Sequence, residues 1–326
     1  MNIGNRVRQA IKEHPDYRLM FFTVAVFLVL IVALSIMSPA FLNPTNLKNI
    51  LVQGSIYVIL GVGMTLVLTT GGIDISIGSI VGLSTCFIGS VMKLHGFPFE
   101  IGILAGLLVG TICGVFNGFC IVYLKVPAII TTLGSWTMFR GLANWYLGGT
   151  IYYDFAPGFV SIARGNILGV PVPIVLAFIV MLAGYYFLSR TRTGRNIVAL
   201  GGNEEAARLA GINVNRTRFL VYAIMGFLAG FAAVVVTSRL NSASSVIGSG
   251  MELHTIAAVV VGGTSLFGGR GLMLGTLLGV YILGILENGL LLGGISFFGQ
   301  RVTLGLIFIL VVAARTFRQK EGEIAA

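Results

Sequence analysis

The stretch from Leu19 to Met37 reads LMFFTVAVFLVLIVALSIM and contains no charged residue. A helix needs about 20 apolar residues to cross the hydrocarbon core of a bilayer, so this stretch predicts a membrane span. Basic residues between Arg6 and Arg18 precede it, as they precede the apolar region of a signal peptide. Many more apolar stretches of similar length follow, and we therefore expect a retained first span rather than a cleaved leader.

The composition of the whole chain agrees with this. Of 326 residues, 56% are hydrophobic and only 10% are charged, whereas soluble domains carry about 25% charged residues. Gly is abundant, with 45 residues, and membrane helices tolerate Gly because neighbouring helices pack closely against it. The composition predicts an all-α polytopic membrane protein. The net charge of +10 is explained by basic cytoplasmic loops, so no nucleic-acid partner is expected.

Reading the chain at the length of a span gives about ten transmembrane helices, although short junctions leave nine or eleven open. With the N-terminus inside, most Lys and Arg fall on the cytoplasmic side, which places both termini in the cytoplasm. We expect a cytoplasmic segment 1–18, one transmembrane domain 19–314 and a cytoplasmic tail 315–326. The predicted spans are 19–37, 50–70, 74–93, 100–123, 127–147, 171–189, 218–238, 253–269, 272–292 and 297–314. The long outer segments 38–49 and 148–170 are either plain connections or surfaces for an extracytoplasmic partner.

A short sequence pattern recurs between the two halves of the chain. Asn117-Gly followed by a Thr-Leu-Gly at 132–134 returns as Asn288-Gly followed by a Thr-Leu-Gly at 303–305, a constant shift of 171 residues (117 to 288, 132 to 303). In the ten-span topology the copies lie five spans apart and point in opposite directions. This is the arrangement that an inverted repeat requires.

The longest polar interruption between spans is the loop 190–218, which the topology places in the cytoplasm. Asn203 is a favourable helix N-cap, and Glu204 and Glu205 suit the positive end of a helix dipole. Small helix-forming residues follow, and Gly211 is a natural stop. The pattern predicts a short helix from Glu204 to Ala210. It has no aromatic residue to anchor it in lipid, which favours docking to a protein. The residues to which we assign contact with a partner are Asn203, Glu204, Glu205, Ala206, Ala207, Arg208 and Gly211.

This loop resembles a known motif. Glu205-Ala-Ala-Arg-Leu-Ala-Gly211 is similar to the Glu-Ala-Ala-x-x-x-Gly loop that permeases of ATP-binding-cassette importers present to their ATPases. Three more stretches resemble the branch of that family that imports ribose, other simple sugars and related molecules; they are Thr70-GGIDISIG-Ser79, Val126-PAIITTL-Gly134 and Val261-GGTSLFGGR-Gly271. Together with Asn288-Gly-Leu290, the likeness covers about residues 50 to 314.

The resemblance implies a set of partners and a location. It implies an ATPase subunit with two nucleotide-binding domains, an extracytoplasmic solute-binding protein, and a second permease copy or a related permease chain. It also implies that this chain lies in the bacterial inner membrane, in contact with membrane lipid. The loop helix would insert into the ATPase and transmit its closure to the spans. The cargo would be a sugar or a sugar-like small molecule.

Two Gly-rich segments lie at the ends of predicted spans, where the backbone can bend. Gly71, Gly72 and Asp74 begin the third span, where Asp74 is either a helix cap or part of a gate or ATPase contact. A second segment joins the eighth and ninth spans and predicts a tight cytoplasmic turn, in which Arg270 contacts the ATPase, an acidic residue or lipid headgroups. The residues of this turn are Gly262, Gly263, Thr264, Gly268, Gly269 and Arg270.

Several polar residues fall within or near the apolar spans, where ionisable groups are costly and usually face a bundle interior or a water-filled path. Arg140 and Glu287 both fall in the outer part of their spans, so they either pair with each other or contribute to the pore. The candidate pore residues of this kind are Asn117, Arg140, Asn144, Glu252, Glu287 and Asn288.

No catalytic constellation is evident. The chain has no phosphate-binding Gly-x-x-x-x-Gly-Lys-Ser/Thr motif, its three His residues lack metal-ligand spacing, and no Ser/His/Asp group shares a plausible site. We therefore expect no enzyme activity, no cofactor and no metal, with ATP hydrolysis on a separate subunit. The alternatives are an ion-coupled secondary transporter of a small polar solute and, less favoured, an intramembrane enzyme. The first of these usually buries acidic coupling residues, and the spans are nearly free of charge.

Overall fold

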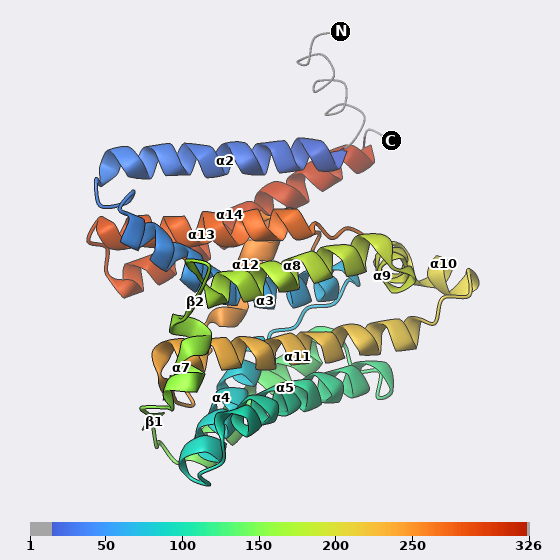
Figure 1. Cartoon of the computed structure of the whole chain (residues 1–326). Coiled ribbons are helices and arrows are strands. Elements are labelled where there is room, and N and C mark those ends of the chain that lie inside the picture. The colour runs from blue at the N-terminus through green and yellow to red at the C-terminus, as the bar shows by residue number, and fades with distance from the viewer. Residues whose placement is uncertain (1–14, 325–326) are drawn as a thin grey trace.

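The computed structural model describes residues 15–324, and within them the chain forms a helical bundle with very little sheet (Figure 1). The helices are α2 Pro15–Met37, α3 Pro44–Thr69, α4 Ile77–Lys93, α5 Phe99–Val122, α6 Ala128–Leu147, α7 Pro157–Arg164, α8 Val172–Arg190, α9 Arg192–Gly202, α10 Glu204–Leu209, α11 Val214–Leu240, α12 Met251–Val261, α13 Met273–Leu292 and α14 Phe297–Ile324. The strands are β1 Tyr152–Tyr153, β2 Asn166–Ile167, β3 Val170–Pro171 and β4 Ser242–Ala243.

Six of these helices are long and apolar enough to cross a membrane, namely α2, α3, α5, α8, α11 and α13. The prediction of an all-α membrane protein is therefore confirmed, while the count of ten crossings stays a prediction. Several predicted bounds differ from the structure by a few residues, as for α3, which begins at Pro44 and not at residue 50. Two others differ where the chain breaks. The span 253–269 is helical only to Val261, because consecutive glycines at 262 and 263 start a turn there, and the span predicted from Asp74 begins at Ile77.

The connections gather at the two ends of the bundle. The short elements α7, β1 and β2 lie at one end, and α9 and α10 lie at the other (Figure 1). Strand β1 pairs with β4, so that Tyr152 faces Ala243, and β2 pairs with β3 in a small hairpin. The start of α2 and the end of α14 lie at the same end as α10.

The segments predicted for the two chain ends are only partly described. Residues 1–14 and 325–326 of the predicted cytoplasmic segments lie outside the described residues. The remainder of the predicted segment 1–18 belongs to α2. The tail predicted to start at residue 315 instead continues α14 as far as Ile324, so no boundary is seen at residue 314.

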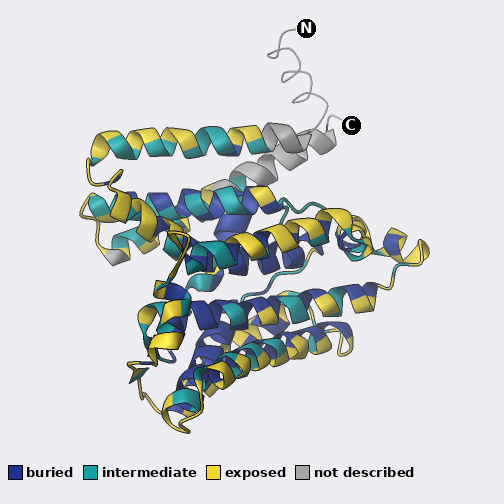
Figure 2. Cartoon of the chain, viewed as in Figure 1, coloured by how far each residue is buried: buried dark blue, intermediate teal, exposed yellow. Residues whose placement is uncertain are grey.

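The core is centred on α3, α4 and α11, which are buried over most of their length, whereas α2 is largely exposed (Figure 2). The broadest helix contact joins α5 and α11. Glycines recur at every fourth position of α5, from Gly102 to Gly118, and therefore share one face. A Cβ at Gly226 of α11 would collide with the backbone of Gly110 and Gly114. The two backbones touch through this stripe, as small residues allow in membranes.

Three breaks interrupt the helices inside the protein. Residues 70–76 follow α3, residues 241–250 follow α11, and residues 262–272 separate α12 from α13. Asp74, Ser76 and Thr264 are fully buried at these breaks. Non-helical backbone at membrane depth is tolerated only where the protein itself satisfies its polar groups. The side chains that bond to this exposed backbone therefore occupy positions where the fold requires a polar residue.

The glycine stripe leads to the first testable prediction. We expect Gly226→Ala to lower the free energy of unfolding by about 1–3 kcal/mol, the typical cost of overpacking, because the new methyl group meets the backbone of α5. Gly141→Ala on α6 is the control, since a Cβ there has no neighbour within 4 Å. Denaturation of the detergent-solubilised proteins measures both. Equal stability of the two variants would contradict the close α5–α11 contact.

Candidate functional site

The short helix α10 stands at one end of the bundle between α9 and α11 (Figure 1). The side-chain oxygen Oδ1 of Asn203 accepts a hydrogen bond from the Ala206 backbone N–H at 2.9 Å, which is the N-cap that the sequence predicts. Gly211 has φ +80°, the left-handed conformation that ends a helix. The predicted helix is thus confirmed, although it ends at Leu209 and Ala210 is its C-cap.

Two ion pairs hold this helix in place. Glu204 contacts Arg208 of the same helix at 2.9 Å and Arg218 of α11 at 2.7 Å. The hydrogen bond from Arg218, with a smaller contribution from Arg208, lowers the pKa of the Glu204 carboxyl below its ordinary value. Glu204 therefore stays ionised at neutral pH and ties α10 to the start of α11.

The outward face of α10 is exposed to solvent. Leu209 is 84% exposed, and Glu205, Ala206 and Ala210 are also exposed, whereas Ala207 turns inward and is buried. A largely exposed Leu beside small residues presents a shallow apolar face at the tip of a charged loop.

Helix α9 was not predicted, because residues 190–202 were interpreted as part of the loop 190–218. Thr191 caps it by accepting a hydrogen bond from the Gly194 backbone N–H at 3.0 Å, and two of its own side chains, Ile197 and Leu200, are buried. The available signal was this Thr cap followed by an amphipathic pattern. The helix connects α8 to α10.

The last turn of α9 rests on two of the helix breaks. A Cβ on Gly201 would collide with the Thr69 carbonyl at the end of α3 and with the backbone of Gly269, and a Cβ on Gly268 would press on Gly201 itself. The Gly269 N–H donates to the Thr69 carbonyl at 3.0 Å. The predicted glycine turn 262–271 is confirmed as a turn, and it joins α3 and α9 at a backbone-to-backbone contact.

A buried polar cluster follows at the break 70–76. Both the backbone N–H and the hydroxyl of Ser76 donate to Oδ1 of Asp74, at 2.9 and 2.6 Å, and Asn117 of α5 donates to the Ser76 hydroxyl at 2.8 Å. Among the described residues, Asp74 Oδ2 and the Tyr222 hydroxyl are buried without a hydrogen-bond partner. Asp74 forms a local turn with Ser76 and does not cap α4 directly, because Ser76 is the N-cap residue and α4 has no side-chain capping hydrogen bond; its role in a gate stays a prediction.

The break at 241–250 is held by Arg140 of α6. Its guanidinium donates to the carbonyls of Ile247 and Gly78, at 3.1 Å each, and to that of Ser245. Nearby, Glu252 at the start of α12 is buried and accepts a hydrogen bond from Trp136 at 3.2 Å. Arg140 thus satisfies carbonyls that a helix break leaves open.

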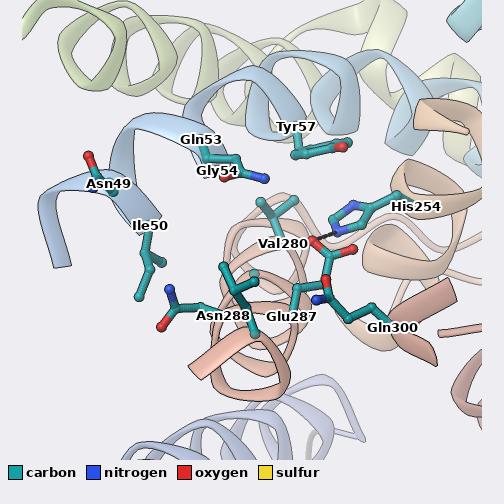
Figure 3. A pocket seen from close by; sticks show the side chains of 12 residues that line it. Asn49, Ile50, Gln53, Gly54, Tyr57, His254, Val280, Glu287, Asn288 and Gln300 are labelled. Atoms are coloured by element: carbon teal, nitrogen blue, oxygen red, sulfur yellow. Dashed lines mark ion pairs between the residues drawn. The ribbon is translucent and has the colours of Figure 1, made fainter. Parts of the chain in front are cut away.

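A separate polar pocket opens between α3, α12, α13 and α14 (Figure 3). Glu287 of α13 reaches toward His254 of α12, with 3.5 Å between Oε2 and Nε2, and the ring of Tyr57 stacks on the imidazole with centroids 4.0 Å apart. Amide side chains complete the lining; they are Asn49, Gln53, Asn288 and Gln300. Asn288 also exchanges hydrogen bonds with Asn46 at 2.8 and 2.9 Å, clasping α13 to the start of α3.

The candidate pore residues therefore fall into different groups. The suggested pairing of Arg140 with Glu287 is wrong, because backbone carbonyls surround Arg140 while Glu287 faces His254. Asn117 joins the Asp74 cluster, and Asn144 is exposed on α6 and belongs to neither group. Tyr57 and His254 were not predicted as site residues, because no sequence pattern around either of them indicates a pocket.

The comparisons with known proteins agree with this architecture. A family model described as "Branched-chain amino acid transport system / permease component" matches residues 46–314. Ribose import permease protein RbsC of Haemophilus influenzae is 42% identical over 89% of this chain and 91% of its own length, and that of Bacillus subtilis is 41% identical over 87% and 88%. D-allose transport system permease protein AlsC of Escherichia coli is 33% identical over 96% and 98%. No solved structure matches the chain.

The Asp74 cluster yields a prediction about stability. Asp74→Ala removes the acceptor of the Ser76 backbone N–H and of the Ser76 hydroxyl hydrogen, so that these two buried donors lose their partner, although the hydroxyl still accepts from Asn117; we expect a loss of about 1–3 kcal/mol. Asp74→Asn retains an oxygen at Oδ1 and should lose clearly less. Denaturation midpoints of both purified variants measure the difference. If Asn is as damaging as Ala, the acceptor role of Oδ1 is not what Asp74 contributes.

Proposed function

Because the chain belongs to the family of permease components of branched-chain amino acid transport systems, we propose that it is the membrane-spanning subunit of an ATP-driven sugar importer. It is a multi-pass protein of the bacterial cytoplasmic membrane. A permease component works within a system that has further components, whereas an ion-coupled carrier commonly works alone. The relatives that are named for ribose and D-allose favour the importer over the ion-coupled alternative.

The observation that carries the proposal is the exposed face of α10. Leu209 stands almost fully exposed at the tip of a capped and ion-paired helix. A rigid helix of this kind costs little further ordering when it enters a groove on a partner. We infer that this groove belongs to an ATPase subunit, which would carry the catalytic residues that the permease lacks in its sequence.

The seating of α9 supports a route for motion from the ATPase to the spans. A displacement of α10 acts on α9 directly, since Asn203 both ends α9 and caps α10. The last turn of α9 in turn presses on the end of α3 and on the turn between α12 and α13. Rigid elements in backbone contact transmit displacement rather than absorb it. Closure of the ATPase would thereby shift the helices beside both breaks.

The helix bounds support the proposed inverted repeat. Adding the shift of 171 residues to the bounds of α3 gives 215–240, and α11 spans Val214–Leu240. The same shift carries α5 to 270–293, where α13 spans Met273–Leu292. The packing follows the same exchange, since α11 lies on α5 and α3 lies on α13. An inverted repeat of this kind fits ten crossings with both termini in the cytoplasm, on the side of α10.

The assembly that we propose contains more than this chain. Two permease copies, or one copy and a related chain, would frame the path, with residues 19–314 as a single transmembrane domain. Two ATPase domains would dock inside and a solute-binding protein outside, at the end that carries α7 and the β2–β3 hairpin. ATP binding and hydrolysis would alternate the path between outward-open and inward-open states by rigid-body motion.

Capture of the ATPase tests both the function and the docking face. The wild-type permease should retain its ATPase subunit in a detergent pulldown. Leu209→Asp should weaken this capture by about tenfold or more, because a charge would enter an apolar contact. Leu168→Asp is the matched control, since Leu168 is fully exposed but lies in the hairpin at the other end. Absence of any ATPase from the wild-type pulldown would refute the importer proposal, and equal capture by both variants would refute the docking face.

The contact beneath α9 offers a second pair of neighbouring variants. Gly201→Ala forces a methyl group against the Thr69 carbonyl, whereas a Cβ on Gly202 has no neighbour within 4 Å. We expect Gly201→Ala to lower ATP-driven sugar uptake by about tenfold, within the usual range of coupling free energies, while ATPase capture is kept. Gly202→Ala should match the wild type. Uptake in proteoliposomes together with ATP hydrolysis measures both, and equal coupling in the two variants would argue that α9 is a passive connector.

A further inference from the structure

The pocket beneath Tyr57 is a built cavity in the membrane domain, and the family match assigns it no role. It measures about 110 Å³, where about 10–15 Å³ suffices for a single water. It can therefore hold several waters or a small solute. Its polar groups come from four different helices that the fold brings together at one point (Figure 3).

His254 is the most unusual member of this lining. Its side chain is 4% exposed, and neither imidazole nitrogen has a hydrogen-bond partner among the described residues, although Nε2 lies 3.5 Å from Glu287. Burial of a polar group without a hydrogen bond costs free energy that a purely structural position would not spend. The unpaired imidazole lies beside the carboxylate of Glu287, which lines the same pocket and can accept hydrogen bonds from something that enters it.

The other half of the chain shows that the fold does not require these polar groups. The shift of 171 residues relates His254 to Leu83, Val280 to Val109, Gly284 to Cys113 and Glu287 to Phe116. The four residues of the first half line a second pocket of about 380 Å³, whose lining contains no ionisable carboxylate or imidazole and is mostly aliphatic and aromatic.

The same four positions of the second half line the polar pocket. The two pockets thus share four positions of the proposed repeat, and at these positions only the second half has an imidazole and a carboxylate. Since Leu and Phe fill these positions in the first half, packing alone does not explain His and Glu in the second.

We propose that the polar pocket is a contact site for a neutral, polyhydroxylated solute of about the size of a pentose on its way through the permease. The proposal rests on the proposed function and deepens it, since it places cargo recognition in the membrane subunit as well. Amides and a carboxylate are acceptors and donors for hydroxyl groups, and an aromatic ring offers an apolar face to a sugar. Glu287 places an acidic side chain in the lining, which includes no Lys or Arg, although the charges of Arg301 and Arg239 also act on Tyr57; we expect neutral sugars to be preferred to sugar phosphates.

Gly284 makes the pocket accessible to a specific test. A Cβ at this position has no neighbour within 4 Å, and its backbone is in an ordinary helical conformation. Gly284→Leu therefore fills the cavity without a backbone conflict. Cys113→Leu is the matched control, because it places the same side chain at the equivalent position of the apolar pocket. Glu287→Phe copies the residue of the first half and serves as a second variant should Gly284→Leu fail to fold.

The experiment is saturation-transfer NMR of D-ribose, D-allose and ribose 5-phosphate with the full-length permease in lipid nanodiscs. We expect signals from one or both sugars with the wild type and Cys113→Leu, and no signal from the phosphate. With Gly284→Leu and Glu287→Phe the sugar signal should fall by about tenfold, as for the loss of one charge-assisted hydrogen bond.

Absence of a sugar signal with the wild type, or an unchanged signal in both pocket variants, would overturn the proposal. A phosphate signal as strong as that of the sugars would overturn the claim of charge selection. ATPase capture by each variant is measured in parallel. A wild type that captures its ATPase but binds no sugar refutes the pocket alone, whereas failure of capture refutes the proposed function.

Discussion

The structure depends on one constraint, which is that backbone N–H and C=O groups within a bilayer must find partners inside the protein. Helices meet this constraint along their length, and difficulty arises only where they break. At each break a side chain or a neighbouring backbone supplies the missing partner. Asp74 serves the segment after α3, Arg140 serves the segment before α12, and the Thr69 carbonyl receives the N–H of Gly269.

The same constraint bears on where the proposed motion could occur. A break that is satisfied by tertiary contacts can shift as a unit, whereas a helix interior cannot bend without losing hydrogen bonds. Glycines at positions 71, 201 and 268 allow three backbones to meet at one end of the bundle, directly below α9 and α10. Helix α9 thus connects α10, the proposed contact with the ATPase, to these meeting backbones.

The sequence predicted those features that follow from local chemistry. The cap at Asn203 and the stop at Gly211 were evident because capping depends on neighbouring residues. Helix α9 escaped notice since its Thr191 cap stands beside basic residues that resemble plain loop. The polar pocket could not be predicted, because Tyr57, His254 and Glu287 come from three helices that only the tertiary fold brings together. The same holds for the carbonyls around Arg140, which lie about a hundred residues away in the chain.

The energy source of transport distinguishes an ATP-driven importer from an ion-coupled carrier. Sealed vesicles that contain the permease with its ATPase and binding protein can be loaded with ATP, while ionophores collapse every ion gradient. The account predicts that sugar enters such vesicles and that uptake stops when ATP is left out or replaced by a non-hydrolysable analogue. Uptake that persists without ATP and instead requires an imposed proton or sodium gradient would contradict it.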